Sequence, residues 1–249
     1  MKRGAVFMVV LATLLALILS GCGQQQFTIQ KGKLLVGTET AIPPYVSMEG
    51  GKLVGYSVEL CEELAKRMGL ECEIVDVPKD ELFNALDSEK IDIIGKPTKI
   101  TPERSEKYDV SIPYLENNNA VYVVQGSSVK SEADLSGKVV GVRAGTPSVE
   151  EIKKIEGVKE VKLYDTHELG IAALKKGEID AYVGLDDMVS YLAKKKEGKI
   201  VKVFELGPPE WTGIYVKKGN TKLLEKVNEA LEKMKEDSTL QKLEDKWLD

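Results

Sequence analysis

Side chains that commonly hold metals or act as nucleophiles are scarce in this chain of 249 residues. It has a single histidine, His167, and three cysteines, Cys22, Cys61 and Cys72. A structural zinc site needs four such ligands at close spacing, and these four residues are widely separated along the sequence. We therefore expect no metal site and no cofactor.

Charged side chains limit the kinds of partner that this chain can have. Lysine and arginine number 35, and aspartate and glutamate number 40, which gives a formal net charge of −5. Binding to nucleic acid needs basic patches that displace counterions from phosphates, so we expect no nucleic-acid partner. Hydrophobic residues make up 43 %, which is enough for one large or two modest cores.

The first residues have the features of a secretory signal. Lys2 and Arg3 give a positive start, and an almost wholly apolar run of about 15 residues follows over 5–19. Crossing a hydrocarbon core of about 30 Å takes about 20 apolar residues, so this run is short for a membrane span. Small residues at its end complete the pattern of an exported chain. The alternative is an uncleaved anchor helix, which would also leave the rest of the chain outside the cytoplasm.

Leu19-Ser20-Gly21-Cys22 resembles the lipobox of bacterial and archaeal lipoproteins. The resemblance implies that a signal peptide (1–21) is removed, that Cys22 is lipidated, and that 22–32 tether the chain to the outer face of the cytoplasmic membrane, in a periplasm or at the cell surface. Loss of the two basic residues of the signal lowers the net charge of −5 by 2, to −7. In an exported chain Cys61 and Cys72 could pair, although Cys61 also fits the apolar face of a predicted helix.

Short apolar runs alternate with amphipathic stretches from residue 33 onward. The first half predicts strands over 34–37, 73–77 and 91–94, and helices over 54–68 and 81–86. The pattern restarts with strands over 138–142, 161–164 and 181–183, helices over 148–155, 169–176 and 188–195, and a long C-terminal helix over 222–247.

This alternation is typical of parallel sheets joined by crossover helices, so the predicted fold class is α/β. Two units of about 80–100 residues each match the usual size of a domain. Ligands of open α/β sheets bind beyond the carboxyl ends of the strands. Two such units that face one another would present those ends across a cleft.

Three groups of motifs occur in order along the chain. They are Val36-Gly37-Thr38-Glu39 with Pro43-Pro44-Tyr45 and 51–56, then 90–94 with Ile100-Thr101-Pro102-Glu103-Arg104, and finally 213–220 with 242–247. Together they resemble family 3 extracellular solute-binding proteins, glutamine-binding proteins among them, which have the type II periplasmic-binding-protein fold. The similarity covers nearly the whole of 33–249.

The resemblance implies two Rossmann-like α/β lobes joined by two crossing strands, near 120–124 and 204–210. Lobe 1 would comprise 33–117 and 213–249, and lobe 2 would comprise 118–212. The implied function is that of the substrate-binding lipoprotein of an ABC importer, which captures a small polar amino acid without chemistry and delivers it to the membrane permease. Such a protein is expected to be a monomer.

The same resemblance assigns ligand-binding roles to individual residues. Arg104 and Thr101 belong to the motif whose arginine holds the ligand carboxylate, and a planar guanidinium can make two parallel hydrogen bonds to a carboxylate. Glu39 and Asp186 lie where acids bind the ligand ammonium, although the alignment slips by one residue and places Leu185 at the strict position. The alternatives are a surface arginine and a solvated pair of acids.

Lysines stand at positions that usually hold other side chains. Lys99 replaces a Ser or Thr hydroxyl that contacts the ammonium, so it would have to turn away or pair with Glu39 or Asp186. Arg143 lies in a lobe-2 position that varies with substrate, and with Lys99 and Lys79 it makes the predicted cleft basic. That favours a ligand with an extra acceptor or negative group, such as glutamine or glutamate. The alternative is a set of solvated lysines on the rims.

Two further features of the family's pocket are altered. Pro147 has no N–H at a position where one usually meets the ligand carboxylate, which leaves Thr146 or Ser148 as substitutes. The aromatic platforms that usually sandwich the ligand are replaced by Ile42 and Lys79.

Two rival functions share this fold. A cyclohexadienyl dehydratase-like enzyme would use the arginine with a general acid such as Glu39, Asp186 or Glu205. The predicted lipid anchor favours delivery to a transporter over turnover. A sensory ligand-binding domain would require a membrane span downstream, and the sequence has no later apolar run of that length.

Overall fold

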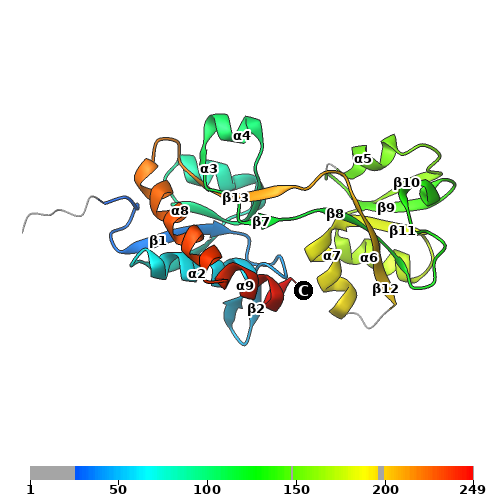
Figure 1. The fold of residues 1–249 in the computed structure, drawn as a ribbon, viewed down its shortest axis with the longest axis horizontal. Coiled ribbons are helices and arrows are strands. Elements are labelled where there is room, and N and C mark those ends of the chain that lie inside the picture. The colour runs from blue at the N-terminus through cyan, green and yellow to red at the C-terminus, as the bar shows by residue number, and fades with distance from the viewer. Residues whose placement is uncertain (1–25, 147, 196–198, 249) are drawn as a thin grey trace, which may run out of the picture.

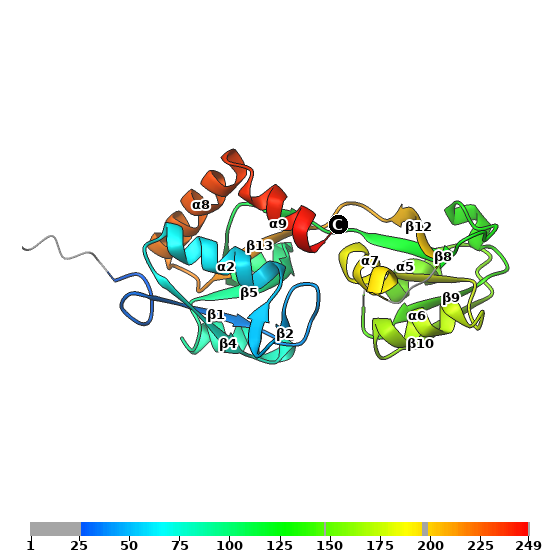
Figure 2. The ribbon, with the colours of Figure 1, turned by 90° about the horizontal axis from the view of Figure 1, so that it is seen from below.

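The chain folds into two α/β lobes that lie side by side and are connected by two crossing segments (Figure 1). The computed structural model describes residues 26–146, 148–195 and 199–248, so the predicted signal peptide, Cys22 and Pro147 lie outside the described residues. Within the described ranges, none of the helices is both long enough and apolar enough to span a membrane. The lobes are equally distinct when the molecule is seen from below (Figure 2).

The sheet of lobe 1 has the strand order β4-β1-β5-β13-β6, and β7 also pairs with β13. Its strands are β1 (Lys33–Thr38), β4 (Glu71–Asp76), β5 (Ile93–Lys99), β6 (Asp109–Val110), β7 (Leu115–Glu116) and β13 (Trp211–Val216). β1 pairs in parallel with β4 and β5, as crossover helices require, whereas β13 runs antiparallel to β5. The predicted α/β class is confirmed, with antiparallel pairing where the chain returns from lobe 2.

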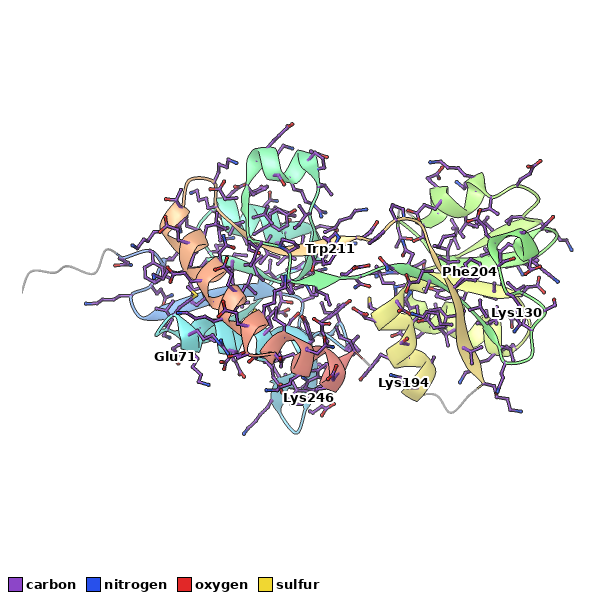
Figure 3. The ribbon with its side chains drawn as sticks, in the orientation of Figure 1. Glu71, Lys130, Lys194, Phe204, Trp211 and Lys246 are labelled. Carbon is purple, nitrogen blue, oxygen red and sulfur yellow. The ribbon has the colours of Figure 1, made fainter. Side chains whose placement is uncertain are left out.

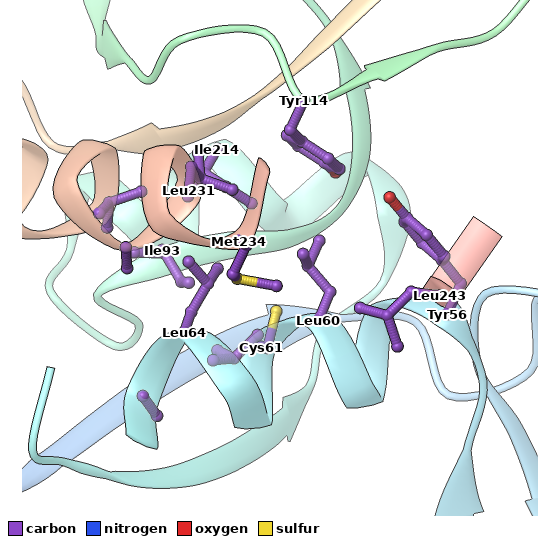
Figure 4. Close-up of a cluster of buried hydrophobic side chains, with 14 of the residues drawn as sticks. Tyr56, Leu60, Cys61, Leu64, Ile93, Tyr114, Ile214, Leu231, Met234 and Leu243 are labelled. Atoms are coloured by element: carbon purple, nitrogen blue, oxygen red, sulfur yellow. The ribbon is translucent and has the colours of Figure 1, made fainter. Parts of the chain in front are cut away.

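Helices cover both faces of this sheet. One face carries α2 (Tyr56–Arg67), α8 (Thr221–Glu236) and α9 (Thr239–Trp247), and the other carries α3 (Leu82–Asp87). Leu60, Leu64 and Met234 are fully buried in the larger core beneath α2 and α8 (Figure 4). Shorter elements complete the lobe: the hairpin β2 (Ser47–Glu49) and β3 (Lys52–Val54), the 3-10 helix η1 (Lys79–Glu81) and α4 (Pro102–Lys107).

The C-terminal helix predicted over 222–247 is in fact two helices. α8 ends at Glu236, and Ser238 adopts a left-handed conformation with φ 61° before α9 begins at Thr239. Arg67 of α2 holds this turn, because its guanidinium donates to Asp237 at 2.8 Å and to Thr239 at 3.1 Å. The turn lets α9 pack back against α2. The apolar periodicity of 222–247 does not reveal this contact with another helix, so it did not predict the break.

Lobe 2 is built on a sheet with the strand order β10-β9-β11-β8-β12. Its strands are β8 (Asn119–Val124), β9 (Val139–Arg143), β10 (Glu160–Tyr164), β11 (Ala181–Leu185) and β12 (Ile200–Leu206), and its helices are α5 (Ser148–Lys154), α6 (His167–Lys175), α7 (Asp186–Lys195) and the 3-10 helix η2 (Glu132–Leu135). β9, β10 and β11 are parallel, whereas β8 and β12 pair in antiparallel fashion. The lobe therefore repeats the mixed architecture of lobe 1.

An aspartate fixes the central strands of each lobe in register. The carboxylate of Asp92 accepts a hydrogen bond from the Leu35 N–H at 2.8 Å, and that of Asp180 accepts one from the Val139 N–H at 2.8 Å. Each aspartate also donates its own N–H to the carbonyl of the same partner residue. Asp92 and Asp180 thus align β5 and β11 with their neighbouring strands. The carboxyl ends of β5 and β11 both contribute residues to the cleft between the lobes.

The chain passes between the lobes at two places that are hydrogen-bonded to each other. The Asn117 N–H donates to the Glu210 carbonyl at 2.8 Å, and the Glu210 N–H donates to the Asn118 side chain at 3.2 Å. β13 begins at Trp211, ahead of the expected lobe boundary at Gly213. Figure 3 shows Trp211 on the lobe-1 side of this crossing.

The described part of the expected tether is attached to lobe 1. The Ile29 N–H donates to the Asp92 carboxylate at 2.7 Å, and the Asn220 side chain donates to the Phe27 carbonyl at 3.1 Å. Within the expected tether (22–32), this described segment is thus bound to lobe 1 through the buried carboxylate of Asp92 and the side chain of Asn220.

Of the two alternatives for Cys61 and Cys72, the structure shows the unpaired one, and both thiols are free. Cys61 lies in the core, where its Sγ is 3.8 Å from the Gly95 carbonyl of β5. Cys72 belongs to β4, the outer strand of the sheet. Burial raises the pKa of the Cys61 thiol well above its usual range and that of Cys72 to about 12. Both thiols are therefore protonated and unreactive at neutral pH.

Candidate ligand-binding cleft

A cleft of about 680 Å³ lies between the lobes, within the usual size range of small-molecule sites. Lobe 1 contributes the carboxyl ends of β1 and β5, and lobe 2 contributes the carboxyl ends of β9 and β11 with the first residues of α5 and α6. All of the predicted ligand residues except Asp186 line it, namely Glu39, Ile42, Lys79, Lys99, Thr101, Arg104, Arg143, Thr146 and Ser148.

Arg104 is held in place at the start of α4. Thr101 caps this helix, and its hydroxyl accepts a hydrogen bond from the Arg104 N–H at 3.3 Å. The guanidinium lies over the Phe83 ring, 5.3 Å from its centroid, and donates to the Lys99 carbonyl at 2.9 Å. These contacts fix the plane of the guanidinium and leave further N–H groups for a carboxylate.

Glu39 is not free to bind an ammonium by itself. It follows β1, and its carboxylate accepts a hydrogen bond from Lys96 at 2.6 Å. Burial lowers the pKa of the Lys96 ammonium, and the charges of Lys79 and Arg143 add to this effect. Sequence reasoning missed Lys96. The pair could have been inferred from the predicted strands, because β1 and β5 are parallel neighbours and their carboxyl ends bring Lys96 beside Glu39.

Lys99 pairs with Glu210, an acid that the sequence analysis did not single out. The sequence analysis left open that Lys99 turns away or that it pairs with Glu39 or Asp186. Glu210 lies in the second crossing segment, and the pairing of β5 with β13 brings it beside the end of β5. The pair therefore sits where the two lobes join.

Lobe 2 brings polar groups to the other side of the cleft. Arg143 ends β9, and its Nε donates to the Asp165 carbonyl at 3.3 Å. The Thr146 hydroxyl donates to the Arg143 carbonyl at 2.8 Å, which fixes the turn between β9 and α5. Ser148, the first residue of α5, is buried at the wall of the cleft. His167 also lines the cleft, although the sequence analysis gave it no role.

Asp186 is used outside the cleft. Its carboxylate accepts a hydrogen bond from the Tyr122 hydroxyl and pairs with Lys202 at 2.7 Å. Glu205, another nominated acid, also pairs with Lys202 at 3.4 Å and does not line the cleft. Leu185, the residue at the strict alignment position, lines it instead. The acid expected from lobe 2 is therefore not brought to this site, because the lysine of β12 engages it.

The cleft also has aromatic walls. Ile42 and Lys79 line it as expected, and the rings of Tyr45 and Phe83 do so as well. The Tyr45 hydroxyl is oriented by hydrogen bonds and the Phe83 ring supports Arg104. Neither ring was predicted to take part.

The charges of the lining do not cancel. Five cationic side chains, Lys79, Lys96, Lys99, Arg104 and Arg143, face three anionic ones, Glu39, Asp80 and Glu210. His167 adds no charge, because burial and the nearby Arg143 lower its pKa to about 4. The cleft therefore carries a net charge of +2 in a protein whose net charge is −5. Such a field attracts anionic ligands into the cleft.

Comparison with known proteins identifies the family. Residues 34–249 match the family model of bacterial extracellular solute-binding proteins, family 3. The chain belongs to this family. Its two-lobed fold is accordingly that of a type II periplasmic binding protein, as the sequence motifs predicted.

Relatives and solved structures agree with this assignment. The L-cystine-binding protein TcyJ of Escherichia coli (strain K12) is 36 % identical over 88 % of this chain and 83 % of its own length. A solved ancestral arginine-binding protein bound to glutamine is 38 % identical, with a TM-score of 0.69 over 88 % of this family 3 chain and 98 % of the other. The ancestral amino acid-binding protein AncCDT-1, a precursor of cyclohexadienyl dehydratase, is 30 % identical, with a TM-score of 0.72 over 88 % and 96 %.

Proposed function

We propose that this solute-binding protein is the extracytoplasmic component of an ABC importer and captures a polar amino acid, with glutamate or glutamine favoured. The observation that supports this most directly is the fixed guanidinium of Arg104 at a cleft between two lobes. Its remaining N–H groups suit the carboxylate that every amino acid carries. The relatives named above bind amino acids according to their names.

The charge of the cleft supports an oxygen-rich ligand side chain. With a net charge of +2, the lining repels the guanidinium of arginine and attracts the second carboxylate of glutamate. Arg104 and Arg143 approach the cleft from opposite lobes, so each can meet one end of a ligand that has acceptors at both ends. The ammonium of such a ligand has Glu39 and Glu210 within the lining, where each would be shared with its lysine.

L-cystine is a second candidate. It too has two carboxylates, and TcyJ, whose name says that it binds L-cystine, is 36 % identical to this chain. The two arginines on opposite walls would serve its two ends as they would serve those of glutamate. Direct titration compares the affinities of the two ligands. It separates these candidates, since glutamate brings one ammonium to the cleft and cystine brings two.

A melting-temperature screen tests the proposed class of ligand. A ligand at about 100 times its dissociation constant should stabilise the protein by about 2.7 kcal/mol. We expect this shift with glutamate, glutamine or cystine in a screen of the twenty amino acids and cystine. If no amino acid raises the melting temperature, the class is wrong.

We also propose that the protein works without chemistry. The carboxylates that line the cleft near its lysines, Glu39 and Glu210, are both held in ion pairs, which suits recognition of charges rather than transfer of protons. The dehydratase-like alternative is tested by incubation with prephenate. Formation of any product would favour the enzyme.

Anchoring through Cys22 completes the proposal. Residues from Gln26 onward attach to lobe 1, so the short segment 23–25 would separate the lipid from the folded protein. We expect the full chain to fractionate with membranes and a Cys22→Ala variant to lose this association. Recovery of Cys22→Ala in the membrane fraction would count against lipidation.

The exported part is expected to be monomeric and to present its closed form to the permease.

A further inference from the structure

His167 is the first residue of α6 and lines the lobe-2 wall of the cleft. Its side chain is only 4 % exposed, so the little surface that it keeps lies at the cleft. Among the described residues its one hydrogen-bond contact runs from Nδ1 to the Tyr182 hydroxyl, at 2.9 Å. The other ring nitrogen, Nε2, therefore has no partner within the part of the chain that the structure describes.

The position of the imidazole is fixed by close packing. The Tyr182 ring meets it edge to face, with centroids 5.9 Å apart and planes at 86°. The ring also lies close to the backbone of Gly184, where a Cβ would come within 2.9 Å of Cε1 and 3.0 Å of Nδ1. Glycine at this position of β11 thus makes room for the imidazole.

The hydrogen bond to Tyr182 also determines which ring nitrogen carries the proton. Tyr182 is fully buried, and its hydroxyl has His167 Nδ1 as its one hydrogen-bond partner among the described residues. A buried hydroxyl proton without an acceptor is costly, so Tyr182 donates its proton to Nδ1. The neutral imidazole then carries its own proton on Nε2. The low pKa of about 4, caused by burial and by the charge of Arg143, keeps the ring neutral at physiological pH.

We propose that His167 is a specificity-determining residue, whose Nε2–H donates a hydrogen bond to an oxygen acceptor on the side chain of the bound amino acid. This inference rests on the proposed function and narrows it to ligands whose side chain ends in an acceptor. A donor-only side chain, such as that of arginine or lysine, would leave the Nε2–H facing another donor. Arg143 on the same wall would strengthen the selection.

Truncation of the ligand and of the residue together tests the proposal by calorimetric titration. The probes are L-glutamate, L-glutamine and L-cystine, which have side-chain acceptors, and L-2-aminobutyrate, which lacks one. His167→Phe keeps a ring of similar size without a donor, and Leu169→Ala, an exposed neighbour on α6, serves as the control. We expect His167→Phe to weaken the best acceptor probe about 5- to 30-fold and to change the affinity for L-2-aminobutyrate less than about twofold.

Other results would overturn the proposal in distinguishable ways. An equal loss for all probes would show that the imidazole only supports the wall, and no loss would show that it does not meet the ligand. Tighter binding of L-arginine than of the acceptor probes by wild type would contradict the selection itself. Absence of binding by any amino acid to wild type would instead overturn the proposed function. His167→Gln, whose side-chain amide can replace the Nε2–H, should recover part of the affinity if Phe is disruptive.

Discussion

The Tyr45 hydroxyl in lobe 1 donates a hydrogen bond to the carboxylate of Asp187 in lobe 2, at 3.1 Å. The same hydroxyl accepts a hydrogen bond from the side chain of Asn117, in the first crossing segment, at 2.6 Å. One phenol therefore links both lobes and their connection. In Figures 1 and 2 the end of α9 lies near α7, the helix to which Asp187 belongs, and the charge of Glu244 on α9 acts on Asp187. Movement of the two lobes relative to each other would therefore change the distance between Tyr45 and Asp187.

Asp187 should make stability depend on pH. Burial raises its pKa to about 7, and the charges of Asp186 and Glu244 contribute. Because the pKa in the unfolded chain is about 3.9, the protonated form favours folding, and this contribution is complete below about pH 4 and lost as pH rises through about 7. Asp187→Asn keeps an acceptor for Tyr45 without the charge. We expect its gain in stability over wild type to grow from small at pH 4 to on the order of 2 kcal/mol at pH 8.

Thermal unfolding at intervals from pH 4 to pH 8 measures this difference. Asp245→Asn, a change at an exposed acid on α9, is the control and should follow wild type. A constant difference between Asp187→Asn and wild type across the range would show that Asp187 titrates normally.

Removal of the Tyr45 hydroxyl should loosen the connection between the lobes. Tyr45→Phe leaves the Asn117 amide and the Asp187 carboxylate without their shared partner, and we expect a loss of about 1–3 kcal/mol in unfolding free energy. Tyr56→Phe is a matched control, because the buried Tyr56 hydroxyl has no hydrogen-bond partner among the described residues. Denaturant unfolding of both variants measures the effect. Equal stability of the two variants would contradict a role for the Tyr45 bonds.

Arg104 should dominate affinity through geometry as well as charge. We expect Arg104→Ala to weaken the ligand found in the screen by about 10- to 150-fold, the equivalent of one or two hydrogen bonds to a charged group. Arg104→Lys keeps the charge but cannot make two parallel bonds, so it should recover only part of the loss. Lys107→Ala, an exposed change on the same helix, is the control. Full affinity in Arg104→Ala would refute the carboxylate assignment.

Lys99 should contribute through the field of the cleft and less through contact, because Glu210 already engages its ammonium. Lys99→Thr lowers the net charge of the lining from +2 to +1. We expect glutamate to bind about 2- to 5-fold more weakly at low ionic strength, with the difference shrinking as salt screens the field. Titrations at low and high salt measure this. A difference that does not change with salt would indicate direct contact.

Gly170 should resist replacement by alanine. In an exposed helix that change stabilises by about 1 kcal/mol. Here the new Cβ would overlap the ring of Tyr182, which packs under α6 and holds His167. We expect Gly170→Ala to lower the unfolding free energy by about 1–3 kcal/mol, whereas Leu169→Ala at the exposed neighbour should change it by less than about 1 kcal/mol. A stabilised Gly170→Ala would show that lobe 2 has room at this position.

Local patterns were sufficient for most elements of the fold. The apolar runs and helical repeats correctly predicted the parallel strands β1, β4, β5, β9, β10 and β11 and the helices α2, α3, α5, α6 and α7, because burial imposes the same periodicity wherever an element lies. They did not predict β13, α4 or the short strands of lobe 1. The break between α8 and α9 was not predictable in this way. It depends on Arg67, which is distant in sequence and binds the turn at Asp237.

The sequence by itself determined the α/β class, the family motifs and the set of charged residues from which a site could be built. Only the tertiary structure decided how those charges are shared. Glu39 pairs with Lys96, Lys99 pairs with Glu210, and Asp186 pairs with Lys202 outside the cleft. The physical reason is that an ion pair depends on the distance between the two charged groups. Strand register and the crossing between the lobes determine that distance for residues that are far apart in the sequence. His167 entered the site for the same reason, since its orientation comes from Tyr182 and not from its neighbours in the chain.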